Sequence, residues 1–321
     1  MERKNKPDVI VIGELNVDII LNRISQFPEM GKEILADDLT VTLGSSSAIF
    51  ASNLSTLGAH VAFIGKIGND SFGSVVLQRL QSKGVNVSGV VQSETLNTGA
   101  TIVLNYDQDR AMITYPGAMN DLKEEDIDFD FLSTARHIHF SSVFLQPGIR
   151  NNLHKIFRMA KSKGLTTSFD PQWDPQEKWD INLEELLPTV DIFLPNMAEF
   201  KLITKSATLI EGLKKIKKIA PETTVILKDG ANGAFAGTAA DFVHQPAFLN
   251  TEVVDCIGAG DSFNAGYIHA FINGYSLEKC LKTGALAGAV STTRPGGTGA
   301  FESLACVKKI ASNQFGQTLN T

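Results

Sequence analysis

Short runs of β-branched and aliphatic residues alternate along this chain with longer segments in which apolar residues recur every three or four positions. The runs expected to be strands occupy residues 9–12, 61–64, 138–140, 166–169, 192–194 and 225–227. The segments between them carry helical stripes, for example Phe50, Leu54 and Leu57. Strands that alternate with helices form a mostly parallel sheet with helices on both faces, so the pattern predicts an α/β fold.

Two segments interrupt this alternation. Residues 14–43 and 95–119 lack a strong helical stripe and contain alternating runs such as 101–104 and 111–115. Such runs are typical of half-buried strands, so we expect antiparallel strands in a small sheet outside the main layers. Since no flexible linker or internal repeat divides the chain, residues 1–321 are expected to form a single domain with this β extension.

The composition excludes several classes of protein. A formal net charge of −6 provides no broad positive field for nucleic acid. No apolar run reaches the length of a membrane span, so no membrane association is expected. The three cysteines, Cys256, Cys280 and Cys306, show no C-x-x-C spacing and favour a reducing compartment, so we expect a cytoplasmic protein.

The sequence that carries most chemical information runs from Asp255 to Asp261. Apolar residues at 263, 267, 268 and 271 predict a buried helix that begins at about Ala259. The small residues Gly258, Ala259 and Gly260 leave the first N–H groups of that helix uncovered, which suits a phosphoryl group. A carboxylate at Asp261 can then take the proton from an attacking hydroxyl. The alternative is a first-turn acid behind ordinary turn glycines.

Residues Asp255–Asp261 resemble the C-terminal signature of the ribokinase-like, PfkB-type carbohydrate kinases, with Cys256 a small departure from it. The resemblance implies a three-layer αβα sandwich with a mostly parallel central sheet and a small β-sheet lid, formed here by residues 14–43 and 95–119. It also implies that Asp261 is the catalytic base and that the amides of Gly258, Ala259 and Gly260 form an anion hole.

A second similarity follows the first expected strand, where Asn16 and Asp18 match the family's G-x-x-N-x-D element. The resemblance implies that they bind the acceptor, and a carboxylate can accept hydrogen bonds from neighbouring sugar hydroxyls. By themselves, the two residues are more typical of a turn after a strand.

Asn196 and Glu199 are similar to the N-x-x-E motif, in which Asn contacts phosphate and Glu orders Mg²⁺ through water. The same two residues also fit a helix N-cap and its capping-box partner.

Lys228, Gly230 and Gly233 match the family's turn along the nucleotide. The segment with Ser291, Arg294 and Gly296 resembles the part near the adenine. In the family, this segment and the region of Asp255 can together enclose a monovalent cation. The resemblance therefore makes K⁺ a candidate cofactor beside ATP and Mg²⁺.

The chain departs from the family's G-G-x-x-x-N motif, since Gly44 is followed by Ser45 and Ile49 stands in place of Asn. Because Ile49 cannot hydrogen-bond to a sugar, we expect the Ser45, Ser46 and Ser47 hydroxyls to substitute for it. Met119 likewise replaces an Asn in a lid turn, so we expect an acceptor pocket more apolar than that of a typical ribokinase.

Three other features of the sequence carry weaker predictions. Asp170 ends an expected strand at the edge where doubly wound sheets bind ligands, and we expect it near the substrate. The pair His137 and His139 is more typical of hydrogen-bonded strand residues than of a metal site. The lysines of residues 214–218 are typical of a solvated helix face.

These patterns predict an ATP-dependent kinase that transfers the γ-phosphoryl group to a hydroxymethyl group of a small ribose- or fructose-like sugar. Its exposed lid edges favour a homodimer. One alternative is a nucleoside kinase of the same fold, whose base would use apolar ground at Ile49, Phe50 and Met119. The other is a non-catalytic protein that binds sugar or nucleotide.

Overall fold

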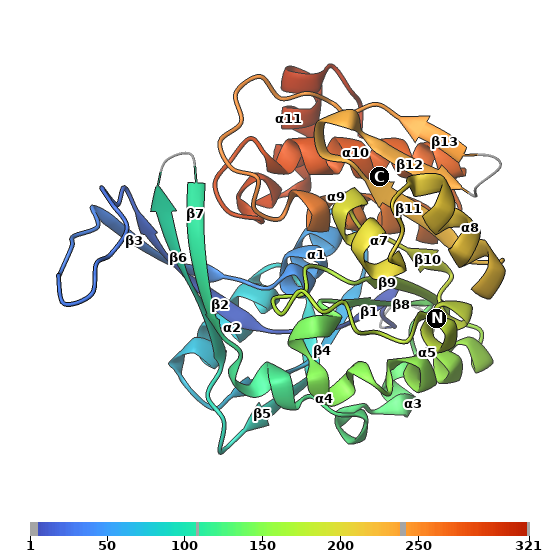
Figure 1. Cartoon of the computed structure of the whole chain (residues 1–321), viewed down its shortest axis with the longest axis horizontal. Helices are drawn as coiled ribbons and strands as arrows, with labels where there is room; N and C mark the ends of the chain where they lie inside the picture. Colours follow the sequence, from blue (N-terminus) through green and yellow to red (C-terminus); the bar gives the residue numbers. More distant parts are fainter. Residues whose placement is uncertain (1–5, 107–108, 238–241, 320–321) are drawn as a thin grey trace.

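A computed structural model describes residues 6–106, 109–237 and 242–319. Its main sheet has nine strands in the order β13-β12-β11-β10-β9-β8-β1-β4-β5, parallel from β11 to β5, with β12 and β13 antiparallel at one edge (Figure 1). The strands are β1 (Val9–Ile12), β4 (Val61–Gly68), β5 (Asn86–Ser93), β8 (His137–Ser141), β9 (Thr166–Asp170), β10 (Ile192–Phe193), β11 (Thr224–Lys228), β12 (Ala234–Gly237) and β13 (Phe242–Gln245).

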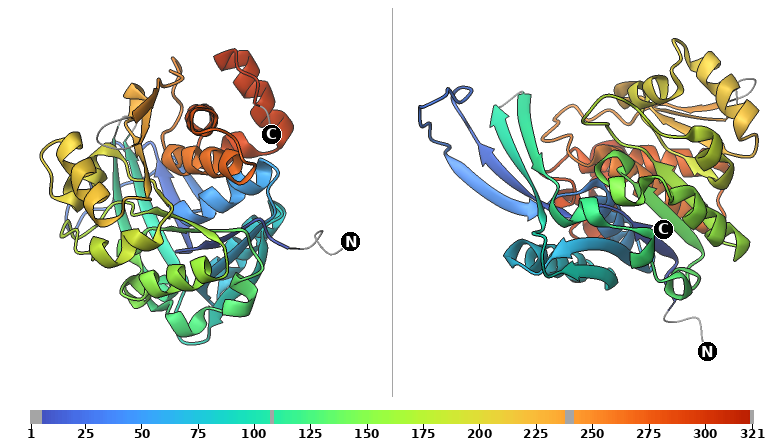
Figure 2. Two further views of the ribbon diagram at one scale, coloured as in Figure 1. Left: turned by 90° about the vertical axis from the view of Figure 1, so that its right-hand side faces the viewer. Right: turned by 60° about the horizontal axis from the view of Figure 1, so that its bottom comes forward.

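Helices cover both faces of this sheet, which confirms the predicted three layers (Figure 2). Val9 and Val11 of β1 belong to one apolar core, with Phe50. Ile10 and Ile12 belong to the other, because successive strand residues point to opposite faces. Residues of α1 (Ser46–Thr56), α2 (Ser71–Ser82), α9 (Ala259–Ile272), α10 (Leu277–Ser291) and α11 (Leu304–Phe315) join the first core. Residues of α3 (Phe129–Leu132), α4 (Pro147–Arg150), α5 (Leu153–Ser162), α6 (Leu183–Leu186), α7 (Met197–Thr204) and α8 (Leu209–Ile219) join the second.

A second sheet, in the order β3-β2-β6-β7, projects from one side of the main body (Figure 1). Its strands are β2 (Asn16–Asn22), β3 (Asp38–Leu43), β6 (Gly99–Tyr106) and β7 (Asp109–Tyr115). The β2–β3 and β6–β7 pairs are antiparallel, as expected, but β2 and β6 pair in parallel, so the expectation of a wholly antiparallel sheet was wrong. Both strands run out from the same edge of the main sheet, β2 after β1 and β6 after β5, which gives them one direction.

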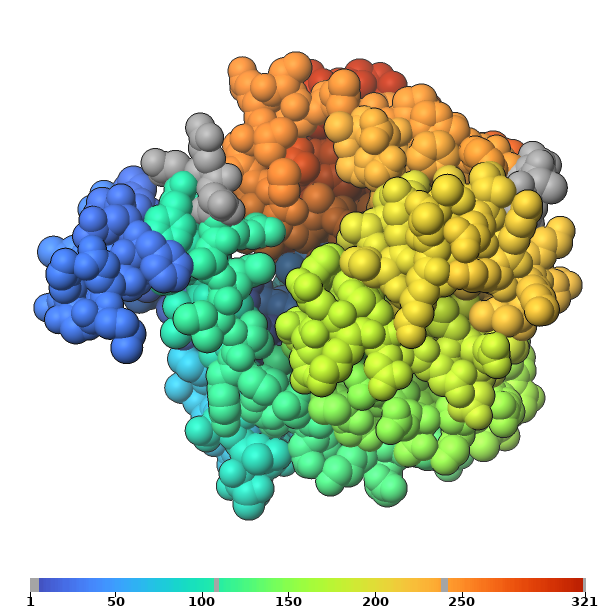
Figure 3. Space-filling model, in the orientation of Figure 1, coloured from blue at the N-terminus to red at the C-terminus, as the bar shows by residue number. Residues whose placement is uncertain are grey.

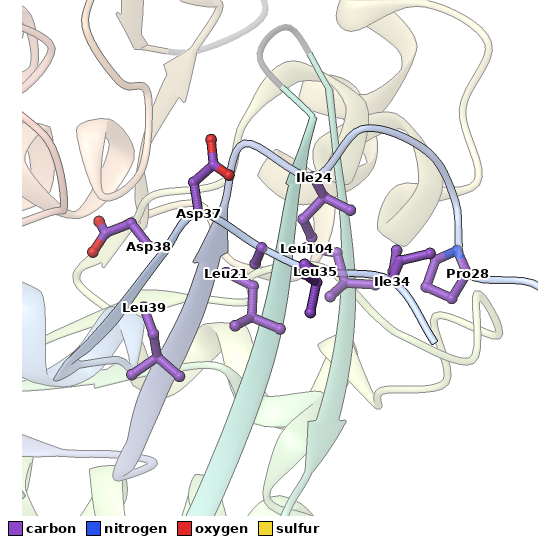
Figure 4. A pocket seen from close by; sticks show the side chains of 10 residues that line it. Leu21, Ile24, Pro28, Ile34, Leu35, Asp37, Asp38, Leu39 and Leu104 are labelled. Carbon is purple, nitrogen blue, oxygen red and sulfur yellow. The ribbon is translucent and has the colours of Figure 1, made fainter. Parts of the chain in front are cut away.

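The second sheet carries an apolar cavity away from the main body. Its volume is about 460 Å³, and its lining comes from β2, β3, β6 and the connection between β2 and β3 (Figure 4). Large apolar side chains are also exposed on the strands of this sheet: Leu39, Ile102, Met112, Ile113 and Tyr115. The second sheet therefore presents both an apolar cavity and exposed apolar side chains at its surface.

β1 lies between β4 and β8: the chain adds β4 and β5 on one side of it and the strands from β8 onward on the other. β1 therefore marks the point where the order of the parallel strands reverses. Val11 of β1 pairs with Phe63 on one side and with His139 on the other. Doubly wound sheets bind ligands outside the carboxyl ends of their strands at such a reversal. Figure 3 shows a hollow between the second sheet and the C-terminal third of the chain, with N-terminal residues at its floor.

Candidate active site

The predicted site residues lie on elements that meet at the carboxyl edge of the main sheet. Asn16 and Asp18 lie in β2, close behind β1. Asn196 caps α7 after β10, and Lys228 is the last residue of β11. The first turn of α9 completes the edge, since Lys228 Nζ lies 3.7 Å from where a Cβ on Gly260 would be.

The N-terminus of α9 has the geometry expected of an anion site. Gly258 is its N-cap, with a φ of +70° that favours glycine. A Cβ on Gly258 would lie 2.6 Å from the Gly297 Cα, and one on Gly260 would approach only Lys228 Nζ within 4 Å. No side chain at 258 or 260 therefore covers the first N–H groups of this helix of 14 residues. The N–H of Ala259 donates to the Cys256 carbonyl at 3.3 Å, while that of Gly260 has no acceptor among the described residues.

Asp261 lies in the first turn of α9 and is 6% exposed. Its Oδ1 accepts a hydrogen bond from Gln172 Nε2 at 2.9 Å. Burial raises the pKa of Asp261 well above its usual value, and the negative charge of Asp170 raises it further, while Lys228 opposes both. The carboxyl group expected to act as base thus has a perturbed pKa, as functional acids and bases often do.

Asp170 and Lys228 form an ion pair behind Asp261. Lys228 Nζ lies 2.6 Å from Asp170 Oδ2, which also accepts from Asn264 Nδ2 at 2.5 Å. Asp170 is fully buried, and the Lys228 side chain is 12% exposed. Burial opposes the charge of Lys228, but Asp170 and Glu199 raise its pKa above the usual value. The pair places a buried positive charge beside the helix N-terminus.

Asn196 and Glu199 form the capping box that the sequence allowed. Asn196 Oδ1 accepts from Glu199 N, and Glu199 Oε2 accepts from Asn196 N, both at 2.8 Å. Burial, followed by the charge of Asp170, raises the pKa of Glu199 to about 7. Glu199 therefore caps α7 and also belongs electrostatically to the Asp170 and Lys228 group.

Asn16 and Asp18 lie together at the base of the second sheet. Asn16 Nδ2 donates to Thr101 Oγ1 at 2.8 Å and to Asp18 Oδ1 at 3.3 Å. Burial raises the pKa of Asp18 to about 6. A Cβ on Gly44 would lie 2.3 Å from Asp18 Oδ1, so a larger residue at 44 would force the Asp18 side chain to move.

The three serines that follow Gly44 are placed differently from one another. Ser45 caps α1, accepting from Ala48 N at 3.0 Å and donating to the Glu14 carbonyl at 2.6 Å. Ser47 is fully buried and bonds the Glu14 carboxyl and Ser141 Oγ. Ser46 is only half-buried. Ser45 is also half-buried, but of the three hydroxyls proposed for the sugar only that of Ser46 makes no hydrogen bond among the described residues.

The apolar residues that favoured a nucleoside are not exposed. Ile49 is 4% exposed, and its side chain would be 2.6 Å from a Cβ on Gly297. Phe50 stacks on His139 with ring centroids 3.8 Å apart, and Met119 is 1% exposed. All three side chains pack into the protein, and the alternative of a nucleoside acceptor stays a prediction.

The residues proposed around a monovalent cation lie at the end of α10 and in the loops before α9 and after α10. Asp255 accepts from Ile257 N at 2.9 Å and from Gly296 N at 2.8 Å, and Arg110 Nη1 of β7 lies 4.0 Å from it. Ser291 Oγ is buried with no hydrogen-bond partner among the described residues. Arg294 forms an ion pair with Glu302 at 3.2 Å. The side chains of Asp255 and Arg294 thus hold the loops, which leaves main-chain oxygens as the candidate ligands.

Gly230 and Gly233 shape the turn after β11, which contains η6 (Gly230–Asn232). Their φ angles are +53° and +93°, and a Cβ on Gly233 would lie 2.1 Å from the Gln245 carbonyl. The turn therefore needs glycine at 233 on steric grounds. The remaining 3₁₀ turns are η2 (Gly117–Asp121), η3 (Glu124–Asp126), η4 (Val143–Leu145), η5 (Leu187–Thr189) and η7 (Gly299–Phe301).

The hydrogen-bonded histidines and the exposed lysine face predicted from the sequence are confirmed. His137 and His139 are fully buried and hydrogen-bond to Thr166 and Ser168 at 2.7 to 2.8 Å. Within the part of the chain that the structure describes, no three His, Cys, Asp or Glu side chains are grouped to hold a metal. The lysines of 214–218 are exposed on α8. Over those same described residues, no helix is long and apolar enough to span a membrane.

The sequence of residues 6–304 matches the family described as pfkB family carbohydrate kinase. The chain belongs to that family. It is therefore a phosphotransferase that uses an alcohol group of its substrate as acceptor. The 2-dehydro-3-deoxygluconokinase of Bacillus subtilis is 28% identical to it over 281 residues, which cover 84% of this chain and 86% of that protein.

Solved structures of ribokinases share the fold of this kinase. A putative ribokinase II from E. coli in its apo form aligns with a TM-score of 0.82 and 26% identity, covering 94% of this chain and 98% of that one. The ribokinase of Arabidopsis thaliana, complexed with ribose and ATP, aligns with a TM-score of 0.82 at 23% identity, covering 95% and 99%. These alignments confirm the predicted ribokinase-like fold.

Proposed function

We propose that this kinase transfers the γ-phosphoryl group of ATP to a hydroxymethyl group of a small ribose- or fructose-like sugar, with Asp261 as general base. The observation that carries the proposal is the position of the buried Asp261 carboxyl in the first turn of α9, beside Lys228. The base, the uncovered helix N-terminus and a buried positive charge are the parts that phosphoryl transfer requires.

The acceptor lies at the end of the site nearest Asn16 and Asp18. Asp18 accepts hydrogen bonds from sugar hydroxyls, and Gly44, which has no side chain, lies next to its carboxylate. Ser46 is the best placed of the three serines to add a contact. Asp261 takes the proton of the reacting hydroxyl as the oxygen attacks phosphorus.

The phosphates of ATP lie at the N-terminus of α9, where the amides of Gly258, Ala259 and Gly260 stabilise charge on the transferring oxygens. Lys228 Nζ, next to Gly260, adds positive charge at the same place. Asn196 and the turn with Gly230 and Gly233 border the rest of the nucleotide.

The residues present fit a Mg²⁺ ion held mostly by phosphates and water. Glu199 supplies a carboxyl whose pKa is raised to about 7 by burial and by Asp170, and a nearby cation would favour its charged form. When bound with ATP, the ion offsets charge on the phosphates. For a monovalent cation such as K⁺, the buried Ser291 hydroxyl and the main chain near Asp255 and Gly296 are the proposed surroundings.

We also propose that the second sheet closes over the acceptor and excludes water from the reaction. Its apolar cavity and exposed apolar side chains support pairing with the second sheet of another copy. The cysteine pattern supports a cytoplasmic location.

An acceptor panel in a coupled assay of ADP release tests the function. The panel holds ribose, fructose, a 2-keto-3-deoxy sugar acid, sugar phosphates and nucleosides. We expect release with a neutral ribose- or fructose-like sugar and little with nucleosides. Release only with nucleosides would refute the sugar assignment. Binding of sugar and ATP by calorimetry without release from any acceptor would indicate a non-catalytic protein.

A further inference from the structure

Gln172 has a backbone conformation that is uncommon for a residue with a Cβ. Its φ is +58°, in the left-handed region. It lies two residues beyond β9's last residue, Asp170, and its N–H donates to Asp170 Oδ1 at 3.2 Å. Such outliers persist where the surroundings hold them, and they concentrate at functional sites.

The side chain of Gln172 joins two carboxylates. Its Nε2 donates to Asp261 Oδ1 at 2.9 Å and to Asp170 Oδ2 at 3.1 Å. The opposite orientation of the amide would place a carbonyl oxygen against two carboxylates, so the chemistry of the neighbours fixes which atom is nitrogen. Both hydrogens of one amide nitrogen are therefore committed to these acids.

We infer that Gln172 is a positioning residue for phosphoryl transfer. It holds Oδ1 of Asp261, leaves Oδ2 for the acceptor hydroxyl, and stabilises the ionised form that can accept a proton. This inference rests on the proposed function, because it assumes that Asp261 is the base.

The charges around Asp261 explain why such a donor is needed. Asp170 from β9 and Glu14 from the segment after β1 both raise the pKa of Asp261, in addition to its burial. Lys228 from β11 lowers it, but Lys228 is itself paired with Asp170 at 2.6 Å and lies in the field of Glu199. The hydrogen bond from Gln172 is a further contribution that favours the charged carboxylate.

The test compares the pH dependence of kcat/KM in wild type, Gln172→Met and Gln172→Gly. Met keeps the length of the side chain but has no N–H donor, and Gly removes the side chain while accommodating a positive φ. We expect kcat to fall about 10- to 100-fold near neutral pH, the range of a lost hydrogen bond to a charged group. The KM for ATP should change little. Gln176→Met, at an exposed residue of the same segment, is the matched control.

The pH profile separates positioning of the base from a structural role. Without the donor the pKa of Asp261 rises further, so the pH below which kcat/KM falls moves to a higher value. In alkaline buffer the difference in kcat/KM between the variant and the wild type becomes smaller. The inference would be overturned if the dependence of kcat/KM on pH in Gln172→Gly matched that of the wild type. It would also be overturned if kcat/KM fell by the same factor at all pH values. Asp261→Asn is measured beside them: if it keeps full turnover, the proposed function itself fails, whatever Gln172 does.

Discussion

Replacing Lys228 with Met should destabilise the protein more than any exposed charge change, because it leaves a buried carboxylate without its cation. Asp170 is fully buried, and Lys228 Nζ is 2.6 Å from its Oδ2. Removing one partner of a buried pair costs about 3–5 kcal/mol, whereas an exposed pair contributes about 0–1 kcal/mol. Hydrogen bonds from Asn264 and Gln172 to Asp170 remain, which favours the lower end of that range.

The free energy of unfolding in urea measures the effect. Lys32→Met is the matched control, since Lys32 pairs with Glu29 and the two side chains are 64% and 58% exposed. The double variant with Asp170→Asn should recover part of the loss, because the uncompensated charge is then gone. High salt should change the Lys228→Met value little. A loss no larger than that of Lys32→Met would refute the reasoning about the buried pair.

Two further predictions follow from the site. Gly258→Ala should cost about 1–3 kcal/mol of stability and most of the turnover, since φ is +70° and the added Cβ would lie 2.6 Å from the Gly297 Cα. Gly274→Ala, at a φ of +74° in open space, should keep wild-type turnover. Equal turnover in the two variants would contradict this prediction. The KM for the sugar should rise as pH falls below about 6, because the pKa of Asp18 is raised to about 6 and its protonated form accepts fewer hydrogen bonds. This rise in KM should be absent in Asp18→Asn. If KM still rises at low pH in that variant, Asp18 does not bind the acceptor.

The sequence predicted the centre of the fold better than its edges. β1 is apolar on both faces, and β8 and β9 are buried although they also carry His, Ser and Thr; all three were predicted as strands, and α9 begins at Ala259 as expected. β5 was missed because polar residues such as Asn86 and Gln92 interrupt its pattern. β12 and β13 were missed because their short runs, AFAG and FVHQ, contain only one β-branched residue between them.

Residues adjacent to a motif were found, and those that depend on distant partners were not. Asp261 and Lys228 lie in recognisable local patterns, but the contact between Gln172 and Asp261 joins residues 89 positions apart. Nothing in the sequence indicates that Gln172 adopts a left-handed φ. Ser47 looked like a sugar ligand because its partner, the Glu14 carboxyl, lies 33 residues away. Only the packing of α1 against the end of β1 shows that this hydroxyl is already bonded.

The most direct test of the account is turnover of Asp261→Asn at saturating ATP and sugar, with ATP affinity measured by calorimetry on the same protein. Loss of a positioned general base predicts a kcat reduced by about 10²–10⁴. Asn has nearly the same size as Asp, so the fold and the ATP affinity should stay close to those of the wild type. A variant that keeps wild-type kcat would contradict the assignment of Asp261 as the base.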